Sequence, residues 1–120
     1  MQIYRWDQMP AERLNDMISR KIVTGRNAML AILDLKKGAA IPEHRHESEQ
    51  ISYVVSGALR FKVNGEELTL RAGQTMVIPS NIPHEVYAEE DTVDMDVFSP
   101  IRTDWLDGSD RYLREMTNRS

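Results

Sequence analysis

The chain has 120 residues, a formal net charge of -4 at pH 7 and no cysteine. Its length is that of one domain, and a domain of this size buries roughly two-thirds of the surface that its unfolded chain exposes. The lack of cysteine excludes disulfides, thiolate metal sites and thiol nucleophiles, and the acidic balance provides no basic patch for nucleic acid. We expect a single domain over residues 1–120 that does not bind nucleic acid.

The N-terminal segment 1–16 carries charges throughout and lacks the apolar region of a secretory signal. No part of the sequence approaches the roughly 20 consecutive apolar residues that a membrane-spanning helix needs. A cytoplasmic protein without a membrane partner is therefore expected.

Much of the chain consists of short segments rich in β-branched and aromatic residues, which favour strands. Turn-forming residues such as glycine, proline and asparagine separate them. The predicted strands are residues 20–23, 27–35, 50–56, 58–63, 66–70, 75–79, 84–88 and 92–98. Their short and fairly even spacing favours an antiparallel sandwich or barrel. Only residues 104–116 show helical spacing.

A hairpin is the most specific local prediction. Apolar and basic residues alternate through 59–63, and the pair Asn64-Gly65 follows. Asn-Gly between alternating segments is the strongest short-range hairpin signal. We expect segments 58–63 and 66–70 to pair, with one face exposed to solvent.

Two of the chain's three histidines, His44 and His46, are separated by a single residue. In a strand, residues with this spacing share one face about 7 Å apart, so both imidazoles can bind one ion. An unbroken strand would place Gln50 about 20 Å from His44. A bend at residues 47–49 is therefore required if Gln50 is to bind the same ion.

The third histidine, His84, follows the sequence IPSNIP. Two prolines and an asparagine, which tolerates positive φ, predict a tight turn that delivers His84 to the start of a strand. On spacing alone, a single histidine in a strand is more often a surface or core residue than a metal ligand.

Segment 92–98 has two chemically different faces. Asp94, Asp96 and Phe98 share one face, and Val93, Met95 and Val97 share the other. The apolar face is expected to be buried, which leaves the acidic face toward solvent or toward a lumen. Arg102 follows shortly after, and a guanidinium is well suited to holding a carboxylate in two parallel hydrogen bonds. On pattern alone, Asp96 and Arg102 are a surface acid and a surface base.

The spacing of the histidines resembles the two motifs of the cupin family. Gly38, His44-x-His46, Gln50 and Gly57 are spaced as in the first motif, with Gln50 in place of its usual glutamate. The second motif is matched by Gly73, Pro79, Asn81 and His84, with Asn81 in place of its second glycine.

The resemblance implies an all-β fold, a single-domain cupin whose double-stranded β-helix or jelly-roll barrel has its core at about residues 18–100. The helical spacing near the C-terminus adds a short helical tail. The resemblance also implies one divalent transition metal in the lumen, and nickel, zinc, iron, cobalt and manganese all suit such donors. The implied metal ligands are His44, His46, Gln50 and His84.

Gln50 distinguishes this set of ligands from the usual one. An amide oxygen is a neutral donor, so three imidazoles and an amide leave the ion its full double charge. Such an ion is a stronger Lewis acid and attracts anionic oxygen atoms. The interpretation predicts an acidic substrate. In the alternative, Gln50 fills the lumen and the ion has three protein ligands.

A closer resemblance covers about residues 18–106. The segments SEQISYVVSG and IPSNIPH, together with DVFSPIRTDWL, are similar to those of the pectin-degradation (KdgF-type) family of small cupins. That family acts on cyclic 4,5-unsaturated uronates from pectin or alginate breakdown and converts them to linear keto forms. Its functional residues, spaced Asp-x-Phe-x3-Arg, correspond to Asp96, Phe98 and Arg102.

The resemblance implies that Asp96 and Arg102 are catalytic. Asp96 would move the proton, Arg102 would bind the acidic sugar, and Phe98 would pack on the sugar and exclude water. Two alternatives are a metal-dependent cupin dioxygenase and a non-catalytic sugar-binding cupin. Small cupins are often dimers, and we expect a homodimer to which Tyr4, Trp6 and the apolar outer faces of the strands contribute.

Overall fold

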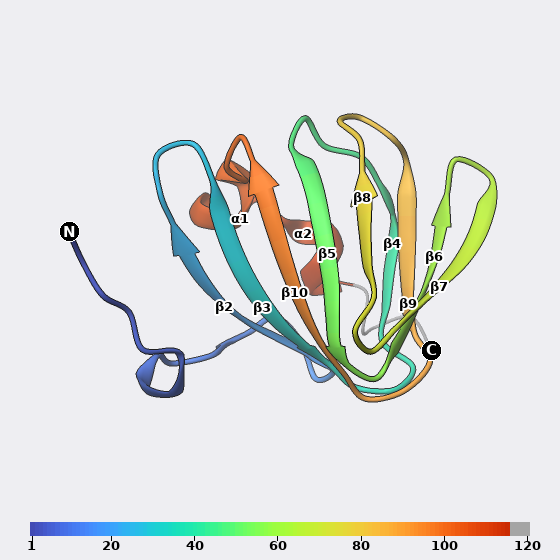
Figure 1. Cartoon of the computed structure of the whole chain (residues 1–120), viewed down its shortest axis with the longest axis horizontal. Coiled ribbons are helices and arrows are strands. Elements are labelled where there is room, and N and C mark those ends of the chain that lie inside the picture. The colour runs from blue at the N-terminus through green and yellow to red at the C-terminus, as the bar shows by residue number, and fades with distance from the viewer. Residues whose placement is uncertain (116–120) are drawn as a thin grey trace.

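The computed structural model describes residues 1–115 and has two antiparallel sheets that face each other (Figure 1). The six-stranded sheet has the order β1 (Glu12–Arg13), β2 (Ile18–Thr24), β3 (Met29–Leu35), β10 (Thr92–Ser99), β5 (Glu49–Ser56) and β8 (Thr75–Ile78). The four-stranded sheet has the order β4 (Ala40–His44), β9 (His84–Ala88), β6 (Ala58–Val63) and β7 (Glu66–Arg71). The predicted all-β jelly roll is confirmed.

Each predicted strand overlaps an observed one, and the structure adds two that the sequence did not indicate. These are β4, which contains Pro42, and the two-residue β1. A 3-10 helix, Trp6–Gln8, precedes them. Among residues 1–115, no helix is long and apolar enough to cross a membrane.

The predicted hairpin is confirmed. Strands β6 and β7 pair from Ala58 opposite Arg71 to Val63 opposite Glu66. Asn64 and Gly65 have φ angles of 50° and 83°, as a type I′ turn requires at both central positions. Apolar side chains of β6 face the core, whereas Lys62 is exposed.

The expectation that the apolar face of β10 is buried is wrong, whereas the alternative that its acidic face points into the lumen is confirmed. Asp94, Asp96 and Phe98 are the buried residues of this strand that face the four-stranded sheet. The opposite face, which carries Val93, Met95 and Val97, is only half-buried and lies on the outside of the sheet. The lumen therefore contains two carboxyl groups.

The C-terminal helical segment is divided in two. Gly108 has a φ of 80°, a left-handed conformation that ends α1 (Thr103–Asp107) before α2 (Arg111–Glu115) begins. The last residue of the predicted segment, residue 116, lies outside the described residues. Figure 1 shows α1 behind β3 and β10, and α2 behind β10 and β5. Trp105 of α1 packs against Phe98 with ring centroids 4.9 Å apart, so α1 covers the end of the core.

A buried ion pair ties this segment to the six-stranded sheet. The side chains of Arg20 in β2 and Asp110, which precedes α2, are both inaccessible to solvent, with Nη1 and Oδ2 2.6 Å apart. This contact lacks hydrogen-bond geometry, so it is an ion pair only. Arg20 also donates to Glu12 Oε1 at 2.9 Å and to the Trp105 carbonyl at 3.2 Å.

Candidate metal centre

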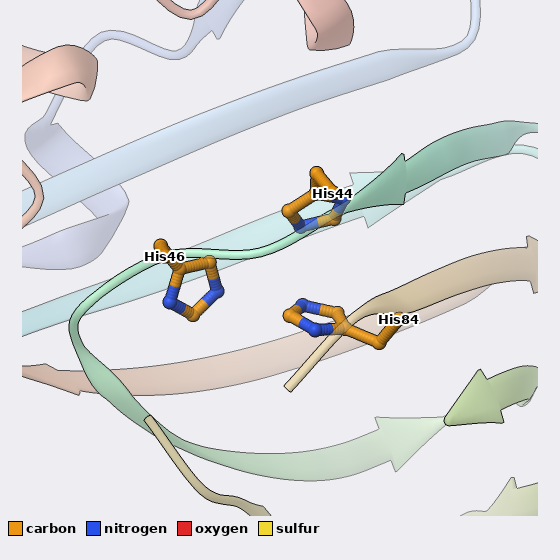
Figure 2. A group of neighbouring side chains, drawn as sticks. All are labelled: His44, His46 and His84. Carbon is orange, nitrogen blue, oxygen red and sulfur yellow. The ribbon is translucent and has the colours of Figure 1, made fainter. Parts of the chain in front are cut away.

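Three histidines meet at one end of the lumen. His44 ends β4 and His84 begins β9, where the two are register partners, and His46 lies in the loop that follows β4. Figure 2 shows the three rings turned toward one another. One nitrogen from each ring lies within 4.8 Å of the others. The three histidines thus form a group that could hold a metal ion.

Backbone hydrogen bonds fix the proton on the same nitrogen of each ring. His44 Nδ1 lies 2.8 Å from the Pro42 carbonyl oxygen, and His46 Nδ1 lies 2.9 Å from that of Ser48. His84 Nδ1 lies 2.8 Å from the Ile82 carbonyl oxygen. A carbonyl oxygen only accepts, so Nδ1 carries the proton in each ring. The lone pair therefore lies on Nε2, which remains open for a metal.

The imidazoles are held in the form that metal binding requires. Burial lowers the pKa of His44 to about 3 and that of His46 to about 4, and it lowers the pKa of His84 as well. Nε2 of His84 is buried without a hydrogen-bond partner. A buried acceptor of this kind is costly unless something binds it, and a cation fits that position.

The loop between β4 and β5 contains the bend that the sequence analysis required. Residues 47 and 48 are bent, and β5 then begins at Glu49. The bend places Gln50 Oε1 3.1 Å from His46 Nε2. Both atoms are acceptors when the His46 proton is on Nδ1, so no hydrogen bond joins them. A cation bound by both lone pairs would make this contact favourable.

The Gln50 amide is oriented by a chain of hydrogen bonds. Its Nε2 donates to Ser52 Oγ at 2.8 Å, and Ser52 Oγ donates to Asp96 Oδ1 at 2.7 Å. This assigns the amide nitrogen to Ser52 and the amide oxygen to His46. The chain links the predicted metal ligand Gln50 to the predicted catalytic residue Asp96.

Two carboxyl groups share the buried face of β10. Burial raises the pKa of both Asp94 and Asp96, and Asp96 raises that of Asp94 further. Hydrogen bonds from Asp94 and Ser52 and the charge of Arg102 oppose the rise at Asp96. Asp94 Oδ1 has no hydrogen-bond partner in residues 1–115. Burial therefore favours the protonated form of both carboxyl groups, and Ser52 and Arg102 act against this at Asp96.

Arg102 is buried, with 4% of its surface exposed, and Asp96 is 5% exposed, so the interpretation of both as surface residues is wrong. The carboxylate that Arg102 holds in two parallel hydrogen bonds is that of Asp104, at 3.0 Å from Nε and 2.8 Å from Nη2. Its guanidinium carbon lies 5.2 Å from the Phe98 ring centroid and 5.0 Å from that of Trp105.

Six of the seven predicted site residues line one cavity of about 30 Å³, and His46 lies next to it. Its polar lining consists of His44, Gln50, His84, Asp94, Asp96 and Arg102, with Trp105 and Tyr112. Phe98 also lines it, and His46 packs against Phe98 with ring centroids 5.7 Å apart. The cavity has room for an ion and very few water molecules. The seven predicted residues are thus brought together, although their roles stay predictions.

Sequence reasoning missed three polar groups of this site. Asp94 shares its face with Asp96, and this alternation was the available signal. Ser52 lies two residues after Gln50 and belongs to no recognised motif. Tyr112 lies in the C-terminal helical segment, where spacing does not reveal which residue reaches the lumen.

The donor set fits a divalent transition metal. Three neutral imidazoles and an amide oxygen are available together, and nitrogen-rich sites of this kind suit zinc, iron, nickel, cobalt and manganese.

Comparisons with known proteins agree with this geometry. Residues 31–100 match the Cupin domain family. The chain is 37% identical over 103 residues to the pectin degradation protein KdgF of Dickeya dadantii, covering 83% of this chain and 94% of that protein.

Solved structures show the same likeness. KdgF from Halomonas sp. has a TM-score of 0.81 and 33% identity, covering 87% of this chain and 99% of that chain. An RmlC-like cupin from Shewanella frigidimarina has a TM-score of 0.82 and 26% identity, covering 88% and 96%. The chain therefore belongs to the cupin family, and within it to the group of small cupins that includes KdgF.

Proposed function

We propose that this protein is a metal-dependent isomerase that converts cyclic 4,5-unsaturated uronates to their linear keto forms. One observation carries the proposal: the buried hydrogen bonds from Gln50 through Ser52 to Asp96, which connect a metal-ligand candidate to a carboxyl group in the same cavity. The likeness to KdgF, named for pectin degradation, supports the substrate class.

The reaction requires charge stabilisation and proton transfer but no oxidant. Opening of the ring frees an enol oxygen at C5, next to the C6 carboxylate, and ketonisation then adds a proton at C4. The enol proton leaves as the C4 proton arrives, so the product is an isomer of the substrate. A buried acid that exchanges a proton and a site that stabilises an anion are sufficient.

The metal would be held by His44, His46, His84 and Gln50. When bound, a divalent ion supplies Lewis-acid stabilisation for negative charge on a substrate oxygen. The neutral imidazoles and amide do not cancel its charge, which suits an anionic substrate.

The residues of the chain provide the rest. Asp96 moves the proton to C4, and the Ser52 hydroxyl orients its carboxyl group. Arg102 attracts the substrate carboxylate, and Phe98, which is 1% exposed, keeps that side of the cavity free of water. Asp104 holds the Arg102 guanidinium in place.

An ultraviolet assay tests the proposal, because the unsaturated bond conjugated to the carboxylate absorbs and the keto product does not. The metal-loaded protein should remove this absorbance faster than the spontaneous rate, equally in the presence and absence of oxygen. A rate that requires oxygen would favour a dioxygenase, although the ligand set lacks the carboxylate that such sites usually contain. A non-catalytic sugar-binding cupin would leave the spontaneous rate unchanged.

Gln50→Glu tests the neutral ligand. The variant should retain its metal, because a carboxylate is the stronger donor. Its kcat/KM should fall by about tenfold or more, because added negative charge weakens the stabilisation of an anionic transition state. Metal analysis and kinetics on the same preparation separate the two effects.

Ser52→Ala is the comparison for Gln50→Glu, since it removes the hydrogen bond from the Gln50 amide, and also the one to Asp96, but adds no charge. A larger loss in Gln50→Glu than in Ser52→Ala is expected. Undiminished activity of Gln50→Glu at equal metal content would show that the neutral ligand is incidental.

Three further expectations stay predictions: a single domain over residues 1–120, a cytoplasmic location and a homodimer. The homodimer is supported by apolar side chains on the outer face of β5 and β8. These are exposed by 37% to 54% and comprise Ile51, Tyr53, Val55 and Val77.

A further inference from the structure

Tyr112 closes the cavity from the C-terminal side. Its ring, carried by α2, stacks on the His44 ring with centroids 4.6 Å apart and an angle of 28° between the planes. It lines the cavity together with Asp96 and Arg102. A uronate is larger than a cavity of about 30 Å³, so lining residues must move to admit a sugar, and Tyr112 is one of the lining residues.

The hydroxyl of Tyr112 is a hydrogen-bond donor without an acceptor. Its oxygen accepts hydrogen bonds from Arg102 Nη2 and, at 3.3 Å, from Trp105 Nε1. A phenol has one proton to donate, and within residues 1–115 no acceptor receives it.

The backbone of α2 is anchored independently of the cavity. Asp110 forms the buried ion pair with Arg20, Leu113 is 1% exposed, and Asn15 Nδ2 donates to the Leu113 carbonyl at 2.8 Å. These contacts hold the α2 backbone in place and keep the Tyr112 hydroxyl beside Arg102.

We propose that Tyr112 donates a hydrogen bond to the carboxylate of the bound uronate, beside Arg102. A neutral donor next to a buried cation is a suitable pair for an anion, because it adds a hydrogen bond without repelling the cation. This role rests on the proposed uronate substrate, and it adds a residue that the family motifs do not include.

Binding of D-galacturonate, a saturated uronate that cannot react, tests the proposal. Tyr112→Phe keeps the ring on His44 and removes only the hydroxyl. Its Kd for D-galacturonate, measured by calorimetry on metal-loaded protein, should rise about tenfold to hundredfold, as for a lost hydrogen bond to a charged group. Tyr87→Phe, on the outer face of β9, is the control and should bind like the wild type with the same metal content.

A Kd of Tyr112→Phe within twofold of the wild-type value would overturn the proposal, and so would a wild type that does not bind D-galacturonate. Failure of the two proposals can be told apart. Binding that depends on Tyr112 without turnover of the unsaturated uronate contradicts the isomerase and supports this role. Turnover with unchanged binding by Tyr112→Phe contradicts this role alone.

A second measurement applies if Tyr112→Phe does not fold. D-galacturonate should perturb the tyrosine ultraviolet spectrum of the wild type and equally that of Tyr87→Phe, because a phenol that donates to a carboxylate changes its absorption. A spectrum without tyrosine perturbation at saturating D-galacturonate would overturn the proposal.

Discussion

Asp96→Asn is expected to lower kcat for the unsaturated uronate by about 10²- to 10⁴-fold, the usual contribution of a positioned general acid or base. The substitution is nearly isosteric, and the amide oxygen can still accept the hydrogen bond that Ser52 donates to Asp96 Oδ1. Metal content should therefore be unchanged. Loss of ultraviolet absorbance gives kcat, and metal analysis of the same sample shows whether the centre is intact.

Asp94→Asn is the matched control, because Asp94 lies on the same face of β10 and is also buried. Asp94→Asn replaces the neighbouring carboxyl group by an amide and leaves the Asp96 carboxyl group in place. Activity should therefore stay within about tenfold of the wild-type rate. Unchanged turnover in Asp96→Asn would contradict the proton-transfer role. An equal loss of turnover in both variants would mean that the reaction depends on the charge in the lumen and not on proton transfer by Asp96.

Asp110→Asn is expected to lower the free energy of unfolding by about 3 kcal/mol, because the buried Arg20 guanidinium then loses its buried counter-charge. The Arg20 side chain is inaccessible to solvent, and its remaining polar contacts are Glu12, which is half-exposed, and the Trp105 carbonyl. Urea denaturation followed by circular dichroism measures the difference.

The control for Asp110→Asn is Glu67→Gln, which removes a partially exposed partner 3.7 Å from Arg60. Exposed pairs typically contribute at most about 1 kcal/mol, so a much smaller change is expected. A loss below about 1 kcal/mol in Asp110→Asn would mean that the C-terminal segment does not depend on this ion pair. Because α2 carries Tyr112, detachment of that segment would also open the cavity.

The metal-ligand candidates were the most predictable part of the molecule, because their spacing is local. His44 ends β4, His46 follows two residues later in the loop, and Asn81, with a φ of 62°, forms the expected turn before His84. The required bend before Gln50 follows from strand geometry alone. Pairing of β4 with β9 then brings the two motifs together.

What could not be predicted depends on contacts between distant residues. Alternation in β10 distinguishes two faces, but only the packing of the six-stranded sheet against the four-stranded sheet determines which face is buried. The two hydrogen bonds from Arg102 to Asp104 require a particular turn after β10. The pairing of Arg20 with Asp110 joins residues far apart in the sequence, and no local pattern indicates it.

Metal removal and return test the central claim most directly. Protein stripped by a chelator, the same protein reloaded with one divalent metal, and His84→Ala treated in the same way are compared on the unsaturated monouronate. Reloaded wild type should remove the ultraviolet absorbance well above the spontaneous rate, whereas the stripped protein and His84→Ala should remain close to it. Equal rates for stripped and reloaded protein, with metal binding verified, would contradict a metal-dependent uronate isomerase.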